Sequence, residues 1–130
     1  MAVVTGIGPV TPVGIGVDAF WAGMVGGRNG IRTITRFPID DLPVTLAGEV
    51  EGFEPSEFMD TKEARRTDRF TQFGLASAQL AWQDAGSPEV VAERGGVIFA
   101  TGISGIETLL TQHNVLLEKE IGRASCRERV

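Results

Sequence analysis

The stretch from Ala2 to Gly16 constrains the fold of this chain more than any other. Residues 2–4 form an apolar run without polar alternation, which favours a central strand buried on both faces of a mainly parallel sheet. Glycines and prolines follow at once, at Gly6, Gly8, Pro9, Pro12, Gly14 and Gly16. Because these residues free or fix φ, the chain must leave the strand through a tight, pre-shaped loop. Such loops commonly carry chemistry in α/β proteins, so a ligand site is first expected there.

A glycine-rich turn after a first strand also suggests a dinucleotide-binding fold, in which backbone amides hold a pyrophosphate at a helix N-terminus. The spacing argues against it. The third glycine position is occupied by Thr11, Pro12 follows, and the next helical pattern begins only near Val17. We therefore expect a structural loop and no nucleotide cofactor.

Composition narrows the class of protein further. The chain has 130 residues, 42% of them hydrophobic, and a net charge of −5, which is typical of a soluble globular protein and not of a nucleic-acid binder. It has no apolar run of membrane-spanning length and no leader pattern, so a cytoplasmic location is expected. The only cysteine is Cys126, so the sequence predicts neither a disulfide nor a zinc site.

Periodicity predicts alternating helices and strands. Val17 to Val25 reads as a short helix ended by Gly26-Gly27, with an aromatic side packed on a sheet, and residues 44–50 read as a strand. Residues 95–101 read as a second doubly buried strand. Ser104 and Glu107 then form a capping box for a last helix, whose expected apolar face comprises Ile106, Leu109, Leu110, His113 and Leu117.

A long helix is expected from about Lys62 to Ala85, capped by Asp60 with Glu63 three residues later. Its second half should be buried along Phe70, Phe73, Ser77, Leu80 and Ala81. Its first two turns carry a basic stripe with helical spacing, formed by Lys62, Arg65, Arg66 and Arg69. By itself, such a stripe is most simply a solvated face paired with nearby acids.

Several short sequence motifs, separated along the chain, together carry a family resemblance. They are Val3–Gly14, Thr35-Arg36-Phe37, Leu46–Val50, Lys62–Phe70 and Gly102–Glu107. In this order and spacing they resemble the start of β-ketoacyl-acyl-carrier-protein synthases, most closely the type II elongating enzymes of fatty-acid synthesis. The resemblance covers residues 1–119 and implies an α/β, thiolase-like layered fold made of two similar halves. This chain would be only part of the N-terminal half.

The resemblance implies that the parent protein is an acyltransferase, a 3-oxoacyl-[acyl-carrier-protein] synthase of fatty-acid or polyketide synthesis. In the family a cysteine takes the acyl chain, and two histidines assist its decarboxylative Claisen condensation with a malonyl thioester. These enzymes need no redox cofactor or metal and are usually homodimers. The matching catalytic residues fall outside this chain, so the fragment should be inactive. The alternative is a non-enzymatic module that docks a carrier protein.

Site residues follow from the same resemblance. The positions of Lys62, Arg65 and Arg66 contact the acidic acyl carrier protein in the family, and that of Ile103 lines the acyl pocket. Ser104 departs from the usual glycine, which affects the flexibility of this loop. His113 is expected to be a packed or partly exposed histidine without a catalytic role.

The resemblance ends before the chain does. Residues 121–130 match the translation of a common short-read sequencing adapter, so we interpret residues 120–130 as a non-native tail after a partial synthase domain at residues 1–119. Without the tail's three arginines and one glutamate at residues 121–130, the net charge becomes −7. Cys126 lies among those arginines, which could lower its thiol pKa, but it follows no strand and is not expected to be the nucleophile.

Overall fold

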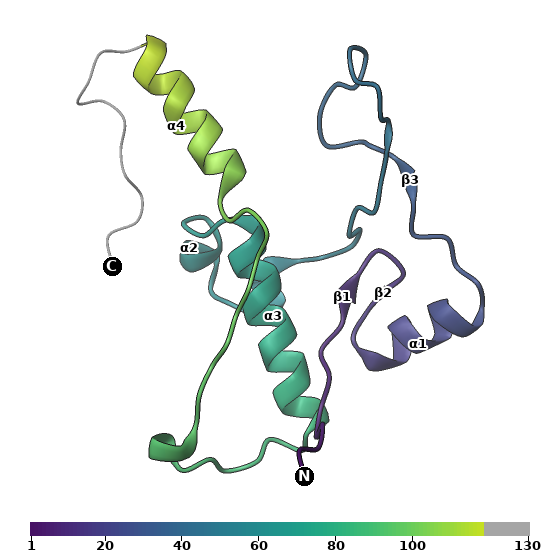
Figure 1. Ribbon diagram of the computed structural model, residues 1–130, viewed down its shortest axis with the longest axis vertical. Helices are drawn as coiled ribbons and strands as arrows, with labels where there is room; N and C mark the ends of the chain where they lie inside the picture. The colour runs from purple at the N-terminus through teal and green to yellow at the C-terminus, as the bar shows by residue number, and fades with distance from the viewer. Residues whose placement is uncertain (119–130) are drawn as a thin grey trace.

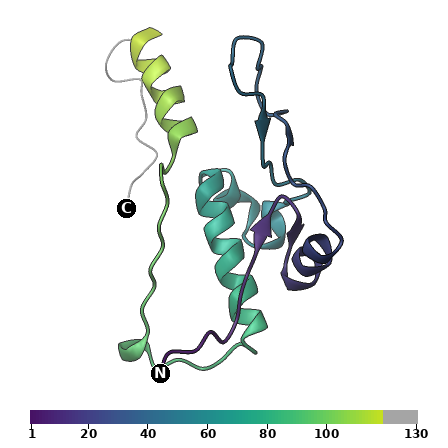
Figure 2. The same ribbon diagram turned by 45° about the vertical axis from the view of Figure 1, so that its right-hand side comes forward.

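Helix α3 (Arg69–Asp84) lies at the centre of the computed structural model, which describes residues 1–118 (Figure 1). The N-terminal segment runs alongside it, and the two views of Figures 1 and 2 agree on this. Contact is close because Gly8 has no side chain: a Cβ there would lie 2.0 Å from the Ser77 carbonyl oxygen. The Ser77 hydroxyl donates a hydrogen bond of 2.5 Å to the Gly8 carbonyl, so this segment is fixed to the helix.

A hairpin and a helix follow. Strands β1 (Val10–Thr11) and β2 (Gly14–Ile15) pair antiparallel around a turn in which the Thr11 hydroxyl donates to the Gly14 carbonyl. Helix α1 (Val17–Val25) packs against β2 and ends at Gly26, as predicted. The expected packing of its aromatic side is wrong for Trp21, which is 66% exposed.

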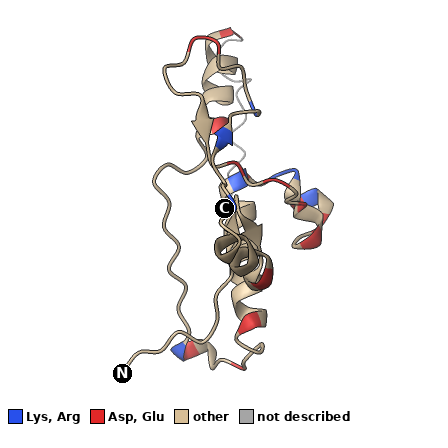
Figure 3. Cartoon of the chain, turned by 90° about the vertical axis from the view of Figure 1, so that its right-hand side faces the viewer, with Lys and Arg blue, Asp and Glu red and all other residues tan. Residues whose placement is uncertain are grey.

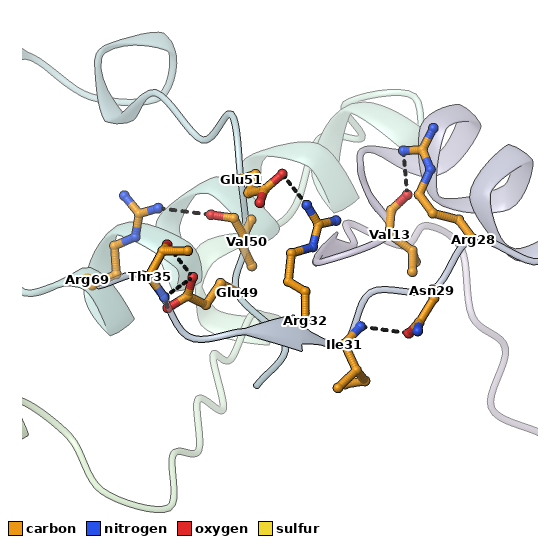
Figure 4. Close-up of polar contacts among 10 residues, drawn as sticks. All are labelled: Val13, Arg28, Asn29, Ile31, Arg32, Thr35, Glu49, Val50, Glu51 and Arg69. Carbon is orange, nitrogen blue, oxygen red and sulfur yellow. Dashed lines mark hydrogen bonds and ion pairs between the residues drawn. The ribbon is translucent and has the colours of Figure 1, made fainter. Parts of the chain in front are cut away.

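The second hairpin is shorter than the sequence predicts. Strands β3 (Arg32–Thr33) and β4 (Leu46–Ala47) pair antiparallel, with Arg32 opposite Ala47, so the strand expected over residues 44–50 is limited to two residues. Beyond the paired residues, the Glu49 carboxylate accepts hydrogen bonds from the backbone of Thr35 (Figure 4). It also accepts one from the Arg36 amide. A side chain therefore replaces the backbone ladder at this end.

The predicted helix over Lys62–Ala85 is wrong in its continuity. After a 3₁₀ turn, η1 (Pro55–Glu57), the chain forms a short helix, α2 (Thr61–Ala64), and then breaks before α3. Asp60 caps α2 as predicted, accepting the amides of Lys62 and Glu63 at 2.8 and 2.9 Å. At the break, Asp68 is extended, with φ −71° and ψ 158°, and occupies the N-cap position of α3, although its side chain makes no capping hydrogen bond.

The two doubly buried strands predicted at residues 2–4 and 95–101 are also wrong. Neither stretch is a strand: Val4, Val97 and Ile98 are 83%, 94% and 99% exposed. A strand is stabilised by its neighbours, and in Figure 1 both stretches run as single traces. A short 3₁₀ turn, η2 (Ala92–Arg94), precedes the second, in which Phe99 contacts α3 at Gly74.

Helix α4 (Ile106–Glu118) extends away from the other elements (Figure 1). Its expected apolar face is present in the sequence, yet Leu109 and Leu117 are 63% and 72% exposed, and His113 is exposed as well. A hydrogen bond from the Thr108 hydroxyl to the Asp68 carboxylate joins its first turn to the start of α3. The predicted Ser104 cap lies outside α4, which begins after Gly105.

The small core lies between α3 and the segment before it. Among residues 1–118, the buried apolar side chains are Phe53 and Ala76, and the buried polar one is Gln72, at 8% exposure. The face predicted through Phe73 and Ser77 is only half-buried. The deepest positions of α3 are thus Gln72 and Ala76, one turn apart, which face the segment that carries η1 and α2.

Candidate functional site

The break between α2 and α3 determines where the predicted basic residues lie. Lys62, Arg65 and Arg66 are all exposed, on α2 and in the turn that follows it. We call these three residues the basic patch. In Figure 3 the short helix that projects from the body of the chain carries Lys and Arg together with acidic residues, since Asp60 caps α2 and Glu63 lies within it. The patch is therefore open to a partner.

Arg69 does not belong to the patch, contrary to the predicted four-residue stripe. Its guanidinium lies 4.8 Å from the ring centroid of Phe53 and 4.7 Å from that of Phe73, and it donates to the Val50 carbonyl (Figure 4). Burial, with a smaller repulsion from Arg36, lowers the pKa of Arg69 below its ordinary value. This arginine joins a loop to α3 through cation–π contacts instead of facing solvent.

Aromatic and amide side chains attach the η1–α2 segment to α3. Phe53 stacks on Phe58 with 5.6 Å between ring centroids and meets Phe73 edge to face at 4.9 Å. Gln72 donates from Nε2 to the carbonyls of Ala64 and Thr67, at 2.8 and 3.1 Å. The segment carrying the basic patch is thus held by both apolar packing and hydrogen bonds.

Sequence reasoning missed the role of Gln72. A polar residue within a helical pattern is usually read as a solvent-facing position, and this one is buried because the helix breaks before it. A signal was present in Thr67-Asp68, which has N-cap chemistry in the middle of the expected helix. A second N-cap there would have predicted the break.

Ile103 lies beside an apolar hollow of about 230 Å³ near the start of α3. Phe70, Phe73 and Ile106 also line it, and Ile103 itself is 71% exposed. Gly105 enters the same hollow with φ +62°, and a Cβ there would lie 2.8 Å from the Asp68 carboxylate. The Ile103 loop therefore closes tightly on the α2–α3 junction.

A more polar hollow of about 340 Å³ lies between the start of α3 and α4. Its lining includes Arg36, Asp68, Arg69, Glu107 and Gln112. Asp68 and Arg69 line both hollows, so the α2–α3 junction separates the basic patch from the loop that carries Ile103. Formal charges in the polar hollow balance, with two guanidinium groups and two carboxylates.

Glu49 organises a further group of polar contacts (Figure 4). Its carboxylate accepts the Thr35 hydroxyl at 2.7 Å, the Thr35 amide at 3.1 Å and the Arg36 amide at 3.3 Å. The Thr35 hydroxyl is the main cause that lowers the pKa of Glu49 below its ordinary value, since these donors favour the charged carboxylate. The nearby Arg32–Glu51 ion pair is exposed and contributes little stability.

Within residues 1–118, no helix is long and apolar enough to cross a membrane. The same residues contain no group of three or more His, Cys, Asp or Glu side chains arranged to hold a metal ion. The site consists of a basic patch, an apolar hollow and the junction between them. Cys126 and the expected tail lie outside the described residues.

Comparison with known proteins settles the family. A sequence profile of the family described as "Beta-ketoacyl synthase, N-terminal domain" matches residues 2–126. The chain belongs to the β-ketoacyl synthase family. The profile covers nearly the whole chain, so the resemblance drawn from separated sequence words is confirmed.

Three curated relatives of this β-ketoacyl synthase chain carry the name "3-oxoacyl-[acyl-carrier-protein] synthase 2". The protein from Synechocystis is 42% identical over 125 residues, which is 95% of this chain and 30% of the relative. The Staphylococcus aureus protein is 41% identical over 95% of this chain and 31% of its own length, and the Coxiella burnetii protein 38% over 88% and 28%. The chain thus spans less than a third of the length of these relatives.

A solved structure confirms the fold class. "The ishigamide ketosynthase/chain length factor" superposes with a TM-score of 0.71 at 29% identity, over 88% of this chain and 29% of that one. The β-ketoacyl synthase chain therefore has part of the N-terminal half of a thiolase-like α/β fold.

Proposed function

We propose that this chain forms the N-terminal part of an elongating 3-oxoacyl-[acyl-carrier-protein] synthase, an acyltransferase that condenses acyl and malonyl carrier-protein thioesters with loss of carbon dioxide. One observation carries the proposal: 42% identity over 125 residues to a relative with that name. The 0.71 TM-score to a ketosynthase structure is consistent with it. The pathway is fatty-acid or polyketide synthesis.

Such an enzyme has two tasks. The first is the chemistry, in which a thiolate takes the acyl chain from its carrier, and hydrogen-bond donors then stabilise the oxyanion that forms when the decarboxylated malonyl group attacks. The second task of any such enzyme is to receive the carrier and to house the acyl chain. In our proposal this chain contributes to the second task, and by itself it is catalytically inactive.

The basic patch is the proposed docking surface for acyl carrier protein. Three exposed cations, Lys62, Arg65 and Arg66, stand on a chain whose net charge is −5. A local positive surface on a negative body attracts an acidic partner to that surface and repels it elsewhere, which raises the association rate and fixes its orientation.

Ile103 is the proposed acyl-pocket residue. The hollow beside it is lined by the aromatic rings of Phe70 and Phe73 and by Ile106. An apolar lining of this kind suits an acyl chain, which carries no group for hydrogen bonding. We further propose that the full-length enzyme is a cytoplasmic homodimer, and that residues 120–130 are a non-native tail.

A chimeric enzyme tests this function. Residues 1–118 replace the matching segment of the Synechocystis relative, giving a full-length enzyme that we call the chimera. We expect it to condense acyl and malonyl thioesters, whereas the 130-residue chain alone does not. An inactive chimera that folds and dimerises like the parent would contradict the proposal.

Charge reversal tests the docking surface within the chimera. Replacing Lys62, Arg65 and Arg66 with Glu should raise KM for the carrier-bound substrate and reduce its dependence on salt, because long-range attraction is lost. The matched control is Arg94→Glu, a reversal at an exposed arginine in η2. Equal KM values for the triple variant and the control would reduce the patch to a solvated face.

A further inference from the structure

Gln72 hydrogen-bonds to the turn between α2 and α3, and this turn carries two residues of the basic patch. We infer that Gln72 is a positioning residue for carrier docking: its buried amide fixes the peptide groups on both sides of Arg65-Arg66 and so holds these two cations in their docking orientation. The inference rests on the proposed docking function of the patch. It adds a residue that touches neither carrier nor substrate.

The backbone at the end of α2 leaves two carbonyls for Gln72. Thr61 accepts the Arg65 amide, while Glu63 accepts the amides of Arg66 and Thr67 and the Thr67 hydroxyl. In a continuous helix the Asp68 amide would donate to Ala64, but the extended backbone of Asp68 ends that ladder. The Gln72 amide takes this place, donating to Ala64 at 2.8 Å and to Thr67 at 3.1 Å.

The position of these two carbonyls in the sequence matters. Ala64 and Thr67 flank the dipeptide Arg65-Arg66 directly. One side chain on α3 therefore anchors the main chain before and after the two arginines. Because Gln72 is 8% exposed and uses both Nε2 hydrogens, its rotamer and the turn it holds are fixed together.

Neighbouring contacts give this amide a rigid base. Gln79, two turns further along α3, donates from Nε2 to the Phe58 carbonyl at 2.7 Å and so ties down the chain ahead of α2. Arg69 lies near the rings of Phe53 and Phe73 and covers the same junction. The segment is attached at its start and its end, and within residues 1–118 the side-chain hydrogen bonds from α3 to the peptide groups flanking Arg65 and Arg66 come from Gln72.

An ordered basic patch binds the carrier more tightly than a mobile patch does. If the turn after α2 were loose, carrier binding would have to order it, and affinity would fall by the fraction of time in which the patch is correctly placed. Chemistry on an acyl group already transferred to the enzyme would not change. Loss of the Gln72 amide should therefore raise KM for the carrier-bound substrate and for no other substrate.

The test compares Gln72→Met with Gln83→Met in the chimera. Methionine preserves length and volume but cannot donate, and Gln83 is an exposed glutamine on the same helix. Two readouts are measured: hydrogen exchange of the amides of residues 62–67, and kinetics with a carrier-bound thioester and with a carrier-free thioester of the same acyl chain.

We expect Gln72→Met to speed exchange over residues 62–67 by about tenfold and to raise KM for the carrier-bound thioester by about three- to tenfold. kcat, and both constants for the carrier-free thioester, should stay within about twofold of Gln83→Met. A matched loss with both substrates would mean general damage to the fold and would overturn the inference.

The triple charge reversal distinguishes failure of the docking function from failure of the positioning role of Gln72. If it raises KM but Gln72→Met does not, the docking function stands and the positioning role of Gln72 is wrong. If the reversal leaves KM unchanged, the docking function fails, and the inference fails with it even where exchange is faster.

Discussion

Replacing Gly8 with Ala tests how closely the N-terminal segment packs on α3. A Cβ at this position would lie 2.0 Å from the Ser77 carbonyl oxygen and 2.6 Å from the Ala81 amide nitrogen. Both atoms belong to the helix backbone, so no side chain can rotate away. Since ordinary contacts begin at about 3.4 Å, the segment must move outward by about 1.4 Å.

This movement has two costs. Overpacking against a rigid element destabilises by about 1–3 kcal/mol. The 2.5 Å hydrogen bond from Ser77 to Gly8 would be lost, at about 1 kcal/mol. The expected loss of about 2–4 kcal/mol corresponds to a fall in Tm of about 2–5 °C for an enzyme of the relatives' length.

The assay is thermal unfolding of the chimera at a fixed scan rate, with Gly96→Ala as the matched control. A Cβ at Gly96 has no atom within 4 Å, so the same substitution there should leave Tm within about 1 °C. If Gly8→Ala melts with the control, the close packing of this segment on α3 is refuted.

Three further predictions concern the isolated chain, pH and the acyl pocket. The 130-residue chain alone should aggregate or lack a cooperative melt, because its accessible area of 10557 Å² exceeds the roughly 6,700 Å² of a compact 13.9 kDa monomer; a dispersed amide NMR spectrum with a sharp melt would contradict this. Glu49→Gln should lower the Tm of the chimera above pH ~4.5 and have less effect in acid. The lowered pKa of Glu49 gives stability that is present above the pKa of the unfolded chain and is lost as pH falls through the pKa of the folded chain. An equal Tm difference from pH 3 to 7 would refute this linkage. Ile103→Trp should shorten the longest acyl chain that the chimera accepts, because the larger side chain fills part of a hollow of about 230 Å³, and unchanged chain-length selectivity would remove Ile103 from the pocket.

Local features of the fold were predictable from the sequence. Helix α1 and its end at Gly26 follow from a short apolar pattern closed by glycine. The Asp60 cap follows from a carboxylate that can accept backbone amides within the next three residues. The exposure of Lys62, Arg65 and Arg66 follows equally from their charge. These features depend on residues within one or two turns, so no distant contact was needed to infer them.

The errors share a different cause. Residues 2–4 and 95–101 have the composition of buried strands, but strands require pairing, and among residues 1–118 these stretches remain unpaired and exposed. The apolar face of α4 is likewise present in the sequence, while Leu109 and Leu117 are exposed. An apolar pattern states which residues prefer burial, and only the surrounding elements decide whether burial occurs.

The family, the Asp60 cap and the basic residues at 62, 65 and 66 follow from the sequence alone, because short motifs and local spacing are properties of the chain. Two features depend on tertiary contacts: Arg69 leaves the basic stripe for the rings of Phe53 and Phe73, and Gln72 is buried. The reason is physical: a buried amide and a guanidinium between two rings are stabilised by groups up to about twenty residues away, and spacing along one helix carries no information about them.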